Sequence, residues 1–364
     1  MSIWRWVDKW DSPPLEARLS LGEGDTPLVR SRHIGPTAGL KNLFFKLETA
    51  TPTGSYKDRF AAAAISHMRA NKQQTCIATS SGNTGAALAA YCAAAKIRCR
   101  IAIVETAPQA KLQQMLAYGA DIFRVKGFGT EPESSKQSIE ALKTLGRLPG
   151  HQLQISAFAH SPKGMEGVES ISLELAEQTP KEIEHVFSPA GGGGLTLAVA
   201  RGFTKTNQSP AIHCAQPEGN NTIAGPLRGG SASAQDVQCS TDISGLQVAT
   251  VIDGHEVIQE CRSTGGTGHL VSDGEVWAAQ KLMARDEGIF SEPAGAVALA
   301  AALKATAHEE INPKATIICL VTGSGFKDVA SVARLNKSDE CPLIKPAQIL
   351  SHGQPELLDK LPTN

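Results

Sequence analysis

The stretch Thr53-Gly54-Ser55-Tyr56-Lys57-Asp58-Arg59 stands between two segments of different periodicity. The apolar run at 43–47 before it predicts a strand, whereas the alanine-rich run at 60–70 after it predicts a helix. Lys57 is therefore expected at the mouth of a strand-to-helix connection. A lysine in a turn is most often a solvated surface charge, so the remaining sequence must decide whether this one is functional.

Size and composition limit the classes of protein that the chain can represent. Its 364 residues favour two domains, and 41% hydrophobic with 20% charged residues is typical of a globular protein. The formal net charge of -1 gives no field to hold nucleic acid, and no apolar run reaches the ~18–20 residues of a membrane span. The N-terminus lacks the apolar core of a signal peptide. We expect a cytoplasmic protein without a nucleic-acid or membrane partner.

The cysteines give no sign of a metal site. There are eight of them, scattered along the chain, and none belongs to a CxxC pair. This spacing argues against zinc and against the disulfide framework of a small secreted protein. Cys319 lies in the apolar run Ile-Ile-Cys-Leu-Val, where a thiol behaves as a small buried hydrophobe.

Strand and helix patterns alternate through most of the chain. Strands are predicted at 43–47, 76–79, 100–104, 121–125, 153–156, 185–187, 211–215 and 316–321. Helices are predicted at 58–71, 84–95, 109–118, 131–145, 165–177, 195–204, 253–263, 273–286 and 294–306. This alternation indicates βαβ units on mainly parallel sheets. We expect an α/β protein with two Rossmann-like, three-layer αβα domains: a small one over 55–155, a large one over 1–54 and 156–340, and a tail over 341–364.

Four turns concentrate glycine and polar residues, at 53–59, 80–85, 188–196 and 322–328. Three of them lie at the carboxyl ends of predicted parallel strands, where open α/β sheets bind their ligands. The run Gly191 to Gly194 is the clearest, because glycine lets the backbone approach a ligand and aim several N–H groups at it. The following helix adds a dipole that suits an anion. Phosphate binding is favoured over a loop that merely needs backbone freedom.

Two of the turns carry polar side chains. Asn83 can donate and accept hydrogen bonds, and Ser81 with the N–H groups after it suits a carboxylate, although a helix N-cap explains this turn equally well. Thr322 follows the strand 316–321, where its hydroxyl either meets a ring nitrogen or caps the turn. A lysine amine that can form a Schiff base beside a phosphate site suggests pyridoxal phosphate.

Taken together, the four turns resemble those of the fold-type II pyridoxal-phosphate enzymes, the tryptophan synthase beta superfamily, which includes threonine synthase, the serine and threonine dehydratases and cysteine synthase. The resemblance covers about residues 20 to 330. The Lys-Asp-Arg after Tyr56 and the Thr-Gly-x-Gly-x-Lys-Asp from Thr322 are most similar to threonine synthase. So is Gly-Glu-Gly-Asp-Thr-Pro-Leu at 22–28, and Glu-Pro-Ala-Gly at 292–295 is common to the wider family.

Two departures leave the substrate open. The glycine turn at 190–195 looks more like that of the dehydratases than like the Gly-Gly-Asn-Leu-Gly of threonine synthases. Where threonine synthases carry an arginine before Leu-Glu-Gly, this chain has Gly164 preceded by Lys163. Another amino acid with a leaving group at Cβ or Cγ is therefore an alternative to O-phosphohomoserine.

The resemblance implies a role for each turn. Lys57 would hold pyridoxal phosphate as a Schiff base and, once freed, act as the general base at the substrate Cα. The cofactor phosphate would lie on Gly191, Gly192, Gly193 and Gly194, with Thr196 as an extra donor. Asn83 would bind the ring hydroxyl oxygen and Thr322 the ring nitrogen. The substrate carboxylate is assigned to Ser80, Ser81 and Thr84, and a leaving phosphate or other side-chain anion to Ser55, Arg59, Lys163 and Lys327. For Arg59, a structural role in a pair with an acidic residue is an equal alternative.

The reaction that these roles imply is a threonine-synthase-type conversion, in which phosphate leaves Cγ and water adds at Cβ. The alternatives are β-elimination from serine or threonine, β-replacement of the cysteate-synthase type, and a cofactor-binding protein without catalysis. The resemblance also implies a homodimer.

Overall fold

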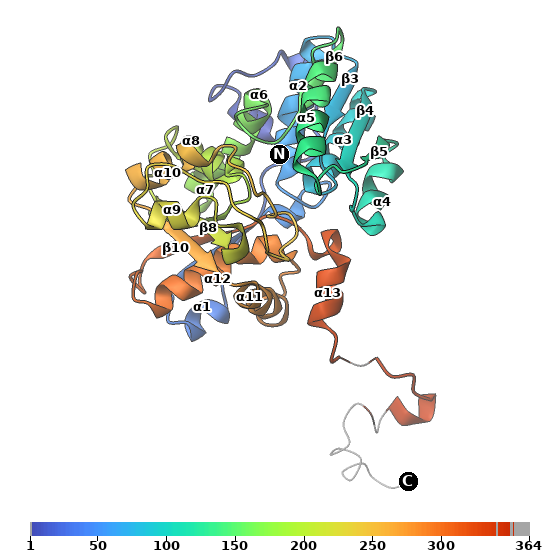
Figure 1. Ribbon diagram of the computed structural model, residues 1–364. Helices are drawn as coiled ribbons and strands as arrows, with labels where there is room; N and C mark the ends of the chain where they lie inside the picture. Colours follow the sequence, from blue (N-terminus) through green and yellow to red (C-terminus); the bar gives the residue numbers. More distant parts are fainter. Residues whose placement is uncertain (1, 340, 350–351, 353–364) are drawn as a thin grey trace.

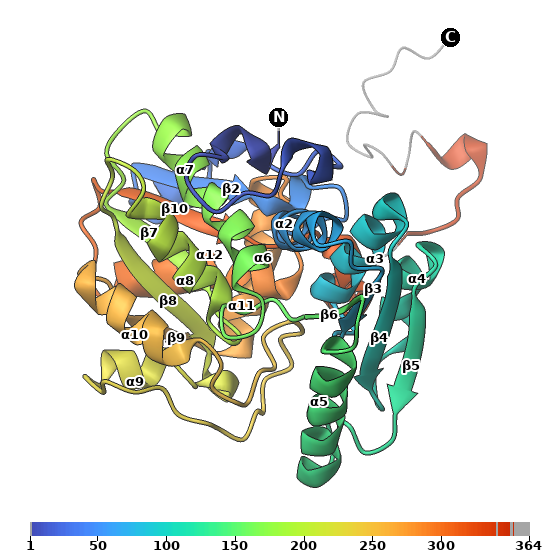
Figure 2. The ribbon, with the colours of Figure 1, turned by 90° about the horizontal axis from the view of Figure 1, so that it is seen from above.

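The chain folds around two separate sheets (Figures 1 and 2). The computed structural model describes residues 2–339, 341–349 and 352. A six-stranded sheet has the order β1-β2-β10-β7-β8-β9, in which only β1 and β2 pair antiparallel. A four-stranded, fully parallel sheet has the order β5-β4-β3-β6. The α/β fold with mainly parallel sheets is thus confirmed.

The strands and helices follow the predicted alternation closely. The strands are β1 (Leu28–Arg30), β2 (Asn42–Leu47), β3 (Thr75–Ala78), β4 (Arg98–Val104), β5 (Asp121–Val125), β6 (His151–Gln154), β7 (His185–Pro189), β8 (Ala211–Pro217), β9 (Gly268–Val271) and β10 (Thr316–Val321). The helices are α1 (Ile34–Thr37), α2 (Lys57–Ala70), α3 (Asn83–Ala95), α4 (Gln109–Ala117), α5 (Pro132–Gly146), α6 (Pro162–Glu166), α7 (Ser170–Gln178), α8 (Gly194–Phe203), α9 (Ala224–Arg228), α10 (Gly254–Ser263), α11 (Asp273–Asp286), α12 (Pro293–Ala307) and α13 (Val329–Leu335).

Alanine-rich helices form the centre of the packing. Nearly every residue of α12 as far as Ala302 is buried against the six-stranded sheet, and α3 is buried from Gly85 to Cys92. Small side chains allow this close approach, because a helix without bulky residues lies nearer to its neighbour. In α2, Ala61 to Ala64 are buried for the same reason, and Figure 2 shows this helix between the two sheets.

One predicted helix is interrupted by contact with α2. The sequence predicts a continuous helix over 165–177, but a 3-10 turn at Gly167–Glu169 separates α6 from α7. A methyl group added at Gly164 would lie 2.5 Å from the Phe60 ring, and one added at Gly167 would lie 2.5 Å from the carbonyl oxygen of Arg59. These glycines are needed because the chain passes directly against α2, and a straight helix would not follow that surface.

Two further regions differ from the expectations or extend beyond them. Strand β9 was not predicted, because a four-residue Gly-His-Leu-Val segment carries little periodicity. Of the tail predicted over 341–364, residues 350–351 and 353–364 lie outside the described part of the chain. No helix among the described residues is both long and apolar enough to cross a membrane.

Candidate active site

The lysine turn and the threonine turn are held together by backbone hydrogen bonds. Ser55 and Gly323 form an antiparallel bridge, and the amide of Tyr56 donates to the carbonyl of Thr322 at 3.1 Å. The amide of Ser324 donates in turn to the carbonyl of Gly54 at 2.8 Å. Gly54 has φ of +86°, which a side chain would strain. Two turns that are far apart in sequence therefore behave as one unit.

Asp58 fixes the start of α2 inside this unit. Its buried carboxylate accepts hydrogen bonds from the amide and the hydroxyl of Thr53, both at 2.7 Å. Burial raises the pKa of Asp58, and the Thr53 bonds oppose that rise. The Asp of the Lys-Asp-Arg motif thus shapes the loop that presents Lys57.

Lys57 reaches from this loop to the neighbouring sheet. Its Nζ donates to the Ser156 hydroxyl at 2.6 Å, and that hydroxyl lies 2.9 Å from the Thr84 hydroxyl. The Tyr56 ring lies 4.5 Å from the amine. The sequence analysis did not identify Ser156 as a site residue. The available signal was its position, two residues beyond β6 at the carboxyl end of a parallel strand.

Buried polar side chains lie near Thr322. Its hydroxyl has no hydrogen-bond partner among the described residues, although it is almost fully buried. Nearby, the Asn83 amide donates to the Glu292 carboxylate at 2.8 Å. Burial raises the pKa of Glu292 to about 7, against the opposing effect of Lys327. A methyl group on Gly323 would lie 2.3 Å from a Glu292 oxygen, so a larger residue here would have to displace that carboxylate.

The glycine turn offers a row of free amide groups. In the described part of the chain, the N–H groups of Gly191 to Gly194 donate no hydrogen bond. The segment 248–257 packs against the turn: Ile252 would lie 3.1 Å from a methyl on Gly192, and Val257 2.8 Å from one on Gly193. Gly193 also has φ of +98°. Thr196 is fully buried and its hydroxyl donates to Ser188 at 3.0 Å, so the glycine amides are the better anion donors.

The 80–85 turn and Ser55 supply the remaining hydroxyls. The Ser80 hydroxyl accepts a hydrogen bond from the Gly82 amide at 3.2 Å, which shapes the start of α3. Ser81 is half-buried and its hydroxyl makes no hydrogen bond within the residues that the structure describes. The Ser55 hydroxyl is fully buried and unpaired in the same set of residues. Ser81 and Ser55 are therefore free to bind a ligand.

The structure corrects the expectation for Arg59. The side chain is completely buried, and its guanidinium is saturated by Glu48 and Glu174 at 2.6 to 2.8 Å and by the hydroxyls of Ser170 and Thr26. No donor remains for a substrate anion. Arg59 thus has a structural role in an ion-pair network that also contains Lys46, 2.7 Å from Glu174.

The expectation for Lys163 is corrected as well. The lysine lies on the surface of α6 and pairs with Asp11 of the N-terminal arm at 2.6 Å and with Glu166 at 3.3 Å. Its side chain is 46% exposed. The charge before the Met-Glu-Gly segment therefore points to the arm and not to Lys57.

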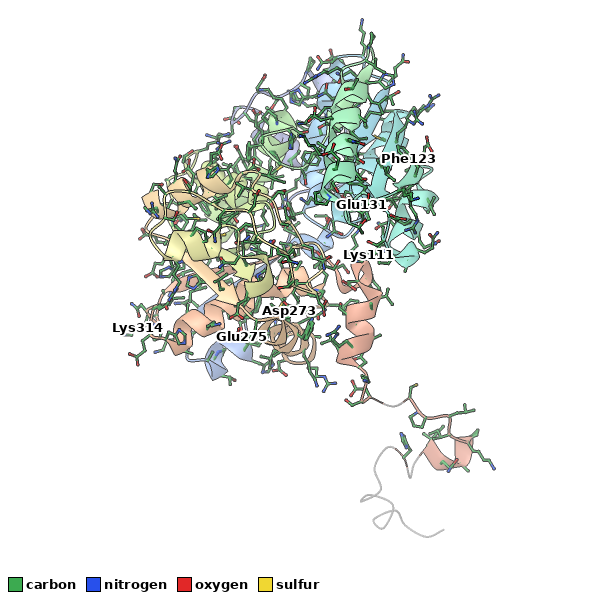
Figure 3. The ribbon with its side chains drawn as sticks, in the orientation of Figure 1. Lys111, Phe123, Glu131, Asp273, Glu275 and Lys314 are labelled. Atoms are coloured by element: carbon green, nitrogen blue, oxygen red, sulfur yellow. The ribbon has the colours of Figure 1, made fainter. Side chains whose placement is uncertain are left out.

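Lys327 is the predicted cation that does face the site. Its amine donates to Gln114 at 2.5 Å, and its charge is felt by both Asp58 and Glu292. Burial lowers the pKa of Lys327, although those two carboxylates oppose the effect. A cavity of about 360 Å³ opens beside it, and Lys111, which donates to Ser244, also lines this space. Figure 3 labels Lys111 near α4. Sequence reasoning missed Lys111, which lies in an ordinary amphipathic helix.

The residues present fit pyridoxal phosphate. Four free glycine amides at a helix N-terminus suit its phosphate, and the unpaired Thr322 hydroxyl supplies a neutral partner for its ring nitrogen. Lys57 is half-buried and already within hydrogen-bonding reach of polar side chains from the other sheet.

Comparison with known proteins agrees with this geometry. The family described as pyridoxal-phosphate dependent enzyme matches residues 19–323. The threonine synthase of Methanocaldococcus jannaschii is 29% identical over 349 residues, which cover 93% of this chain and 83% of that protein. The threonine synthase of Halalkalibacterium halodurans is 28% identical over 314 residues, 85% of this chain and 84% of that protein.

Solved structures share the fold. Maize serine racemase superposes with a TM-score of 0.73 at 27% identity, over 89% of this chain and 95% of that one. Threonine deaminase isoform 2 of Solanum lycopersicum gives 0.74 at 22% identity, over 93% and 94%. The fold, the matched span and the donor set lead to one conclusion: the chain belongs to the pyridoxal-phosphate dependent enzymes of fold type II and is a lyase similar to threonine synthase.

Proposed function

We propose that the protein converts O-phosphohomoserine and water into threonine and phosphate. The observation that carries this proposal is Lys327. This partly buried cation is on the same turn as Thr322, lines the cavity together with Lys111, and passes 3.8 Å from a methyl group built on Gly54 of the Lys57 loop. It therefore supports an anion subsite beside that loop. The curated relatives that are named threonine synthases support the same substrate.

The chain's own residues divide the work as follows. The amides of Gly191 to Gly194 hold the cofactor phosphate, Thr322 faces the ring nitrogen, and Asn83 the ring hydroxyl. When bound, the cofactor supplies the electron sink that makes the substrate Cα–H acidic. The neutral Thr322 hydroxyl leaves the ring nitrogen without a fixed proton, which suits elimination and replacement better than transamination.

Proton transfer falls to Lys57. Its neutral amine takes the proton from the substrate Cα, and the ammonium group so formed returns a proton later; its place in the loop, with Nζ held by Ser156, supports this role. The Ser156 hydroxyl holds the Nζ in place, and Thr84 holds Ser156. Ser80, Ser81 and Thr84 bind the substrate carboxylate. Ser55, Lys327 and Lys111 receive the leaving phosphate.

A second candidate function is β-elimination or β-replacement on serine, threonine or a related amino acid. The dehydratase-like glycine turn favours it. Lys163 favours it too, because this lysine pairs with Asp11 and so does not take the place of the arginine that threonine synthases carry near this position. A cofactor-binding protein without turnover is the third candidate.

One experiment separates the three. The purified protein is incubated with O-phosphohomoserine, and phosphate and threonine are measured; serine and threonine are tested in parallel for ammonia and a 2-oxo acid. Lys57→Ala should abolish turnover and the visible absorption of the bound cofactor, whereas Lys163→Ala, a surface lysine, serves as the matched control. Phosphate release without threonine would refute the first proposal, and a cofactor band without any turnover supports the third.

The domain division and the oligomeric state are also proposals. We propose that 55–155 forms the small domain, that 1–54 with 156–340 forms the large one, and that the protein is a homodimer. The two separate sheets support the division. Size-exclusion chromatography with light scattering tests the dimer.

A further inference from the structure

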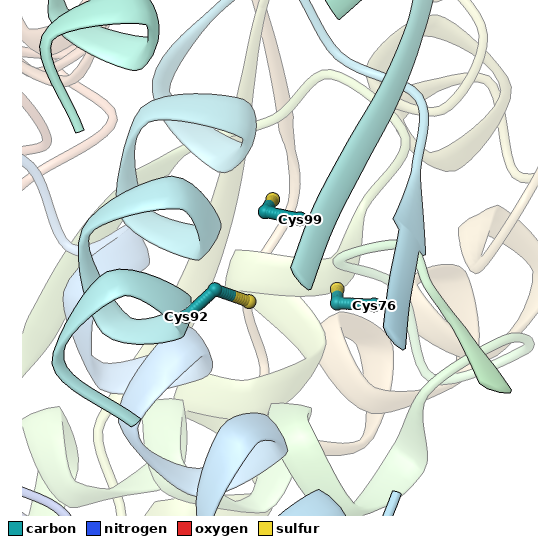
Figure 4. A group of neighbouring side chains, drawn as sticks. All are labelled: Cys76, Cys92 and Cys99. Carbon is teal, nitrogen blue, oxygen red and sulfur yellow. The ribbon is translucent and has the colours of Figure 1, made fainter. Parts of the chain in front are cut away.

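Three cysteines that are dispersed in the sequence come together inside the smaller sheet. Cys76, Cys92 and Cys99 are all buried, and their sulfur atoms lie within 4.8 Å of one another (Figure 4). Among the described residues this is the one such group of His, Cys, Asp and Glu side chains. It lies apart from the residues assigned to the cofactor.

A single βαβ unit fixes the arrangement. Cys76 on β3 and Cys99 on β4 are paired partners on adjacent parallel strands. Cys92 lies on α3, the helix that connects these strands and covers them. Cys76 and Cys99 are each the second residue of their strand, so the cluster lies at the edge opposite the Asn83 turn.

The spacing suits one soft atom bound by all three sulfurs. With bonds of about 2.3 Å, as in zinc thiolates, three sulfurs around a common atom lie up to ~4 Å apart. The sulfurs need only small rotamer adjustments to reach that spacing.

The net charge of the complex with three thiolates indicates which ion the buried site can hold. Among the described residues, none of the three thiols makes a hydrogen bond to a basic side chain; the Cys76 thiol donates to the carbonyl oxygen of Ile77 at 3.9 Å. A tris-thiolate of Zn²⁺ carries a charge of -1 and one of Cu⁺ a charge of -2, and burying an uncompensated charge is costly. A trivalent ion with three thiolates is neutral. Soft sulfur donors also favour a soft acceptor over a hard one.

We propose that Cys76, Cys92 and Cys99 form a binding site for a trivalent thiophilic metalloid, for which arsenic(III) is the probe. Arsenous acid reacts with the three thiols by exchange: three S–H and three As–O bonds break, three As–S bonds form, and three water molecules leave. No oxidant or reductant takes part.

Access does not require global unfolding. Each cysteine is adjacent to, or two residues from, an exposed position: Gln74 precedes Cys76, Ala93 follows Cys92, and Arg98 precedes Cys99. Local opening of the exposed turn between α3 and β4 is enough to uncover the sulfurs. Uptake is therefore expected to be slower than for a surface thiol.

The test uses the full chain with its cofactor bound and sodium arsenite as the probe. Native mass spectrometry should show one arsenic per chain, with a mass gain of one arsenic less three hydrogens. Alkylation after denaturation should show these three cysteines protected. Cys76→Ala, Cys92→Ala and Cys99→Ala should each weaken arsenite binding by about 100-fold or more, because the third bond is intramolecular.

Two controls keep the test decisive. Cys319→Ala removes a lone buried thiol and should leave uptake unchanged. Cys92→Val fills the space left by the thiol, so a folded variant remains if Cys92→Ala is unstable, as thermal melting will show. Three results would each overturn the proposal and leave the cysteines as small core side chains. They are arsenite uptake that survives in Cys92→Val, arsenite uptake that is lost in Cys319→Ala, and no arsenite uptake by the wild type.

Discussion

Replacing Arg59 with methionine tests whether this residue is structural. Methionine fills a similar volume but leaves Glu48 and Glu174 as buried carboxylates without their main partner. Because the side chains of both carboxylates are only 1% exposed, water cannot replace the guanidinium. The loss of stability should therefore be large and the effect on substrate binding small.

The magnitude follows from the network. Removing one partner of a buried ion pair costs about 3–5 kcal/mol. Lys46 still lies 2.7 Å from Glu174 and continues to neutralise it, so the lower part of the range, about 3–4 kcal/mol, is expected. That is a large share of the roughly 5–15 kcal/mol that keeps a typical protein folded.

The assay is urea unfolding followed by circular dichroism, together with steady-state kinetics at a temperature where the variant is folded. Arg228→Met is the control, since this arginine is 45% exposed in its pair with Glu310 and should cost less than about 1 kcal/mol. Adding Glu48→Gln to Arg59→Met should recover part of the loss, because it removes an unpaired charge. A variant with unchanged unfolding and a raised KM would refute the reasoning and return Arg59 to the substrate site.

Three further predictions concern the site and its pH response. Thr322→Ala should lower kcat by about tenfold or more while cofactor loading, read from the visible absorption, changes little; a parallel collapse of loading would contradict its assignment to the ring nitrogen. Ser81→Ala should raise KM by about tenfold, the loss of one hydrogen bond to a charged group, with kcat nearly unchanged; an unchanged KM would place the carboxylate elsewhere. Burial lowers the pKa of His269 to about 4, so the unfolded chain binds this proton first and stability is lost as the pH falls from about 6.5 towards 4. Between pH 7 and 5 this residue should remove about 2 kcal/mol from the free energy of unfolding in urea, and His269→Gln should show a correspondingly smaller loss.

Much of the fold was predictable because strands and helices alternate with clear turn signals. Asn83, the glycine run and Thr322 were predicted as site residues from their local setting, since each closely follows a predicted strand, whereas Lys57 was predicted from its place just before a helix. What such patterns cannot give is the direction of a long side chain. Arg59 and Lys163 are both positively charged and lie in similarly polar motifs. Arg59 is nevertheless buried against carboxylates, whereas Lys163 pairs with Asp11 of the N-terminal arm.

Contacts between distant segments were equally hidden. Ser156 became visible as a site residue only when its hydroxyl was found beside Lys57, 99 positions away. Glu292 lies in a Glu-Pro-Ala-Gly segment that reads as the start of a helix. Its pairing with Asn83, 209 residues earlier, depends on how the two sheets meet. Local periodicity carries no information on such pairings.

The strand order of the larger sheet also determines when its two parts can pair while the chain is being synthesised on the ribosome. Strand β10 lies between β2 and β7, so the early hairpin β1-β2 has no link to β7-β8-β9 within the sheet until residues 316–321 have emerged. The Lys57 loop waits for the same segment, because its backbone partners are Thr322 to Ser324. A nascent chain that stops short of residues 322–324 has made most of its helices and strands but lacks the backbone partners of the Lys57 loop. Closure of the larger sheet and assembly of the Lys57 loop therefore depend on the same late segment.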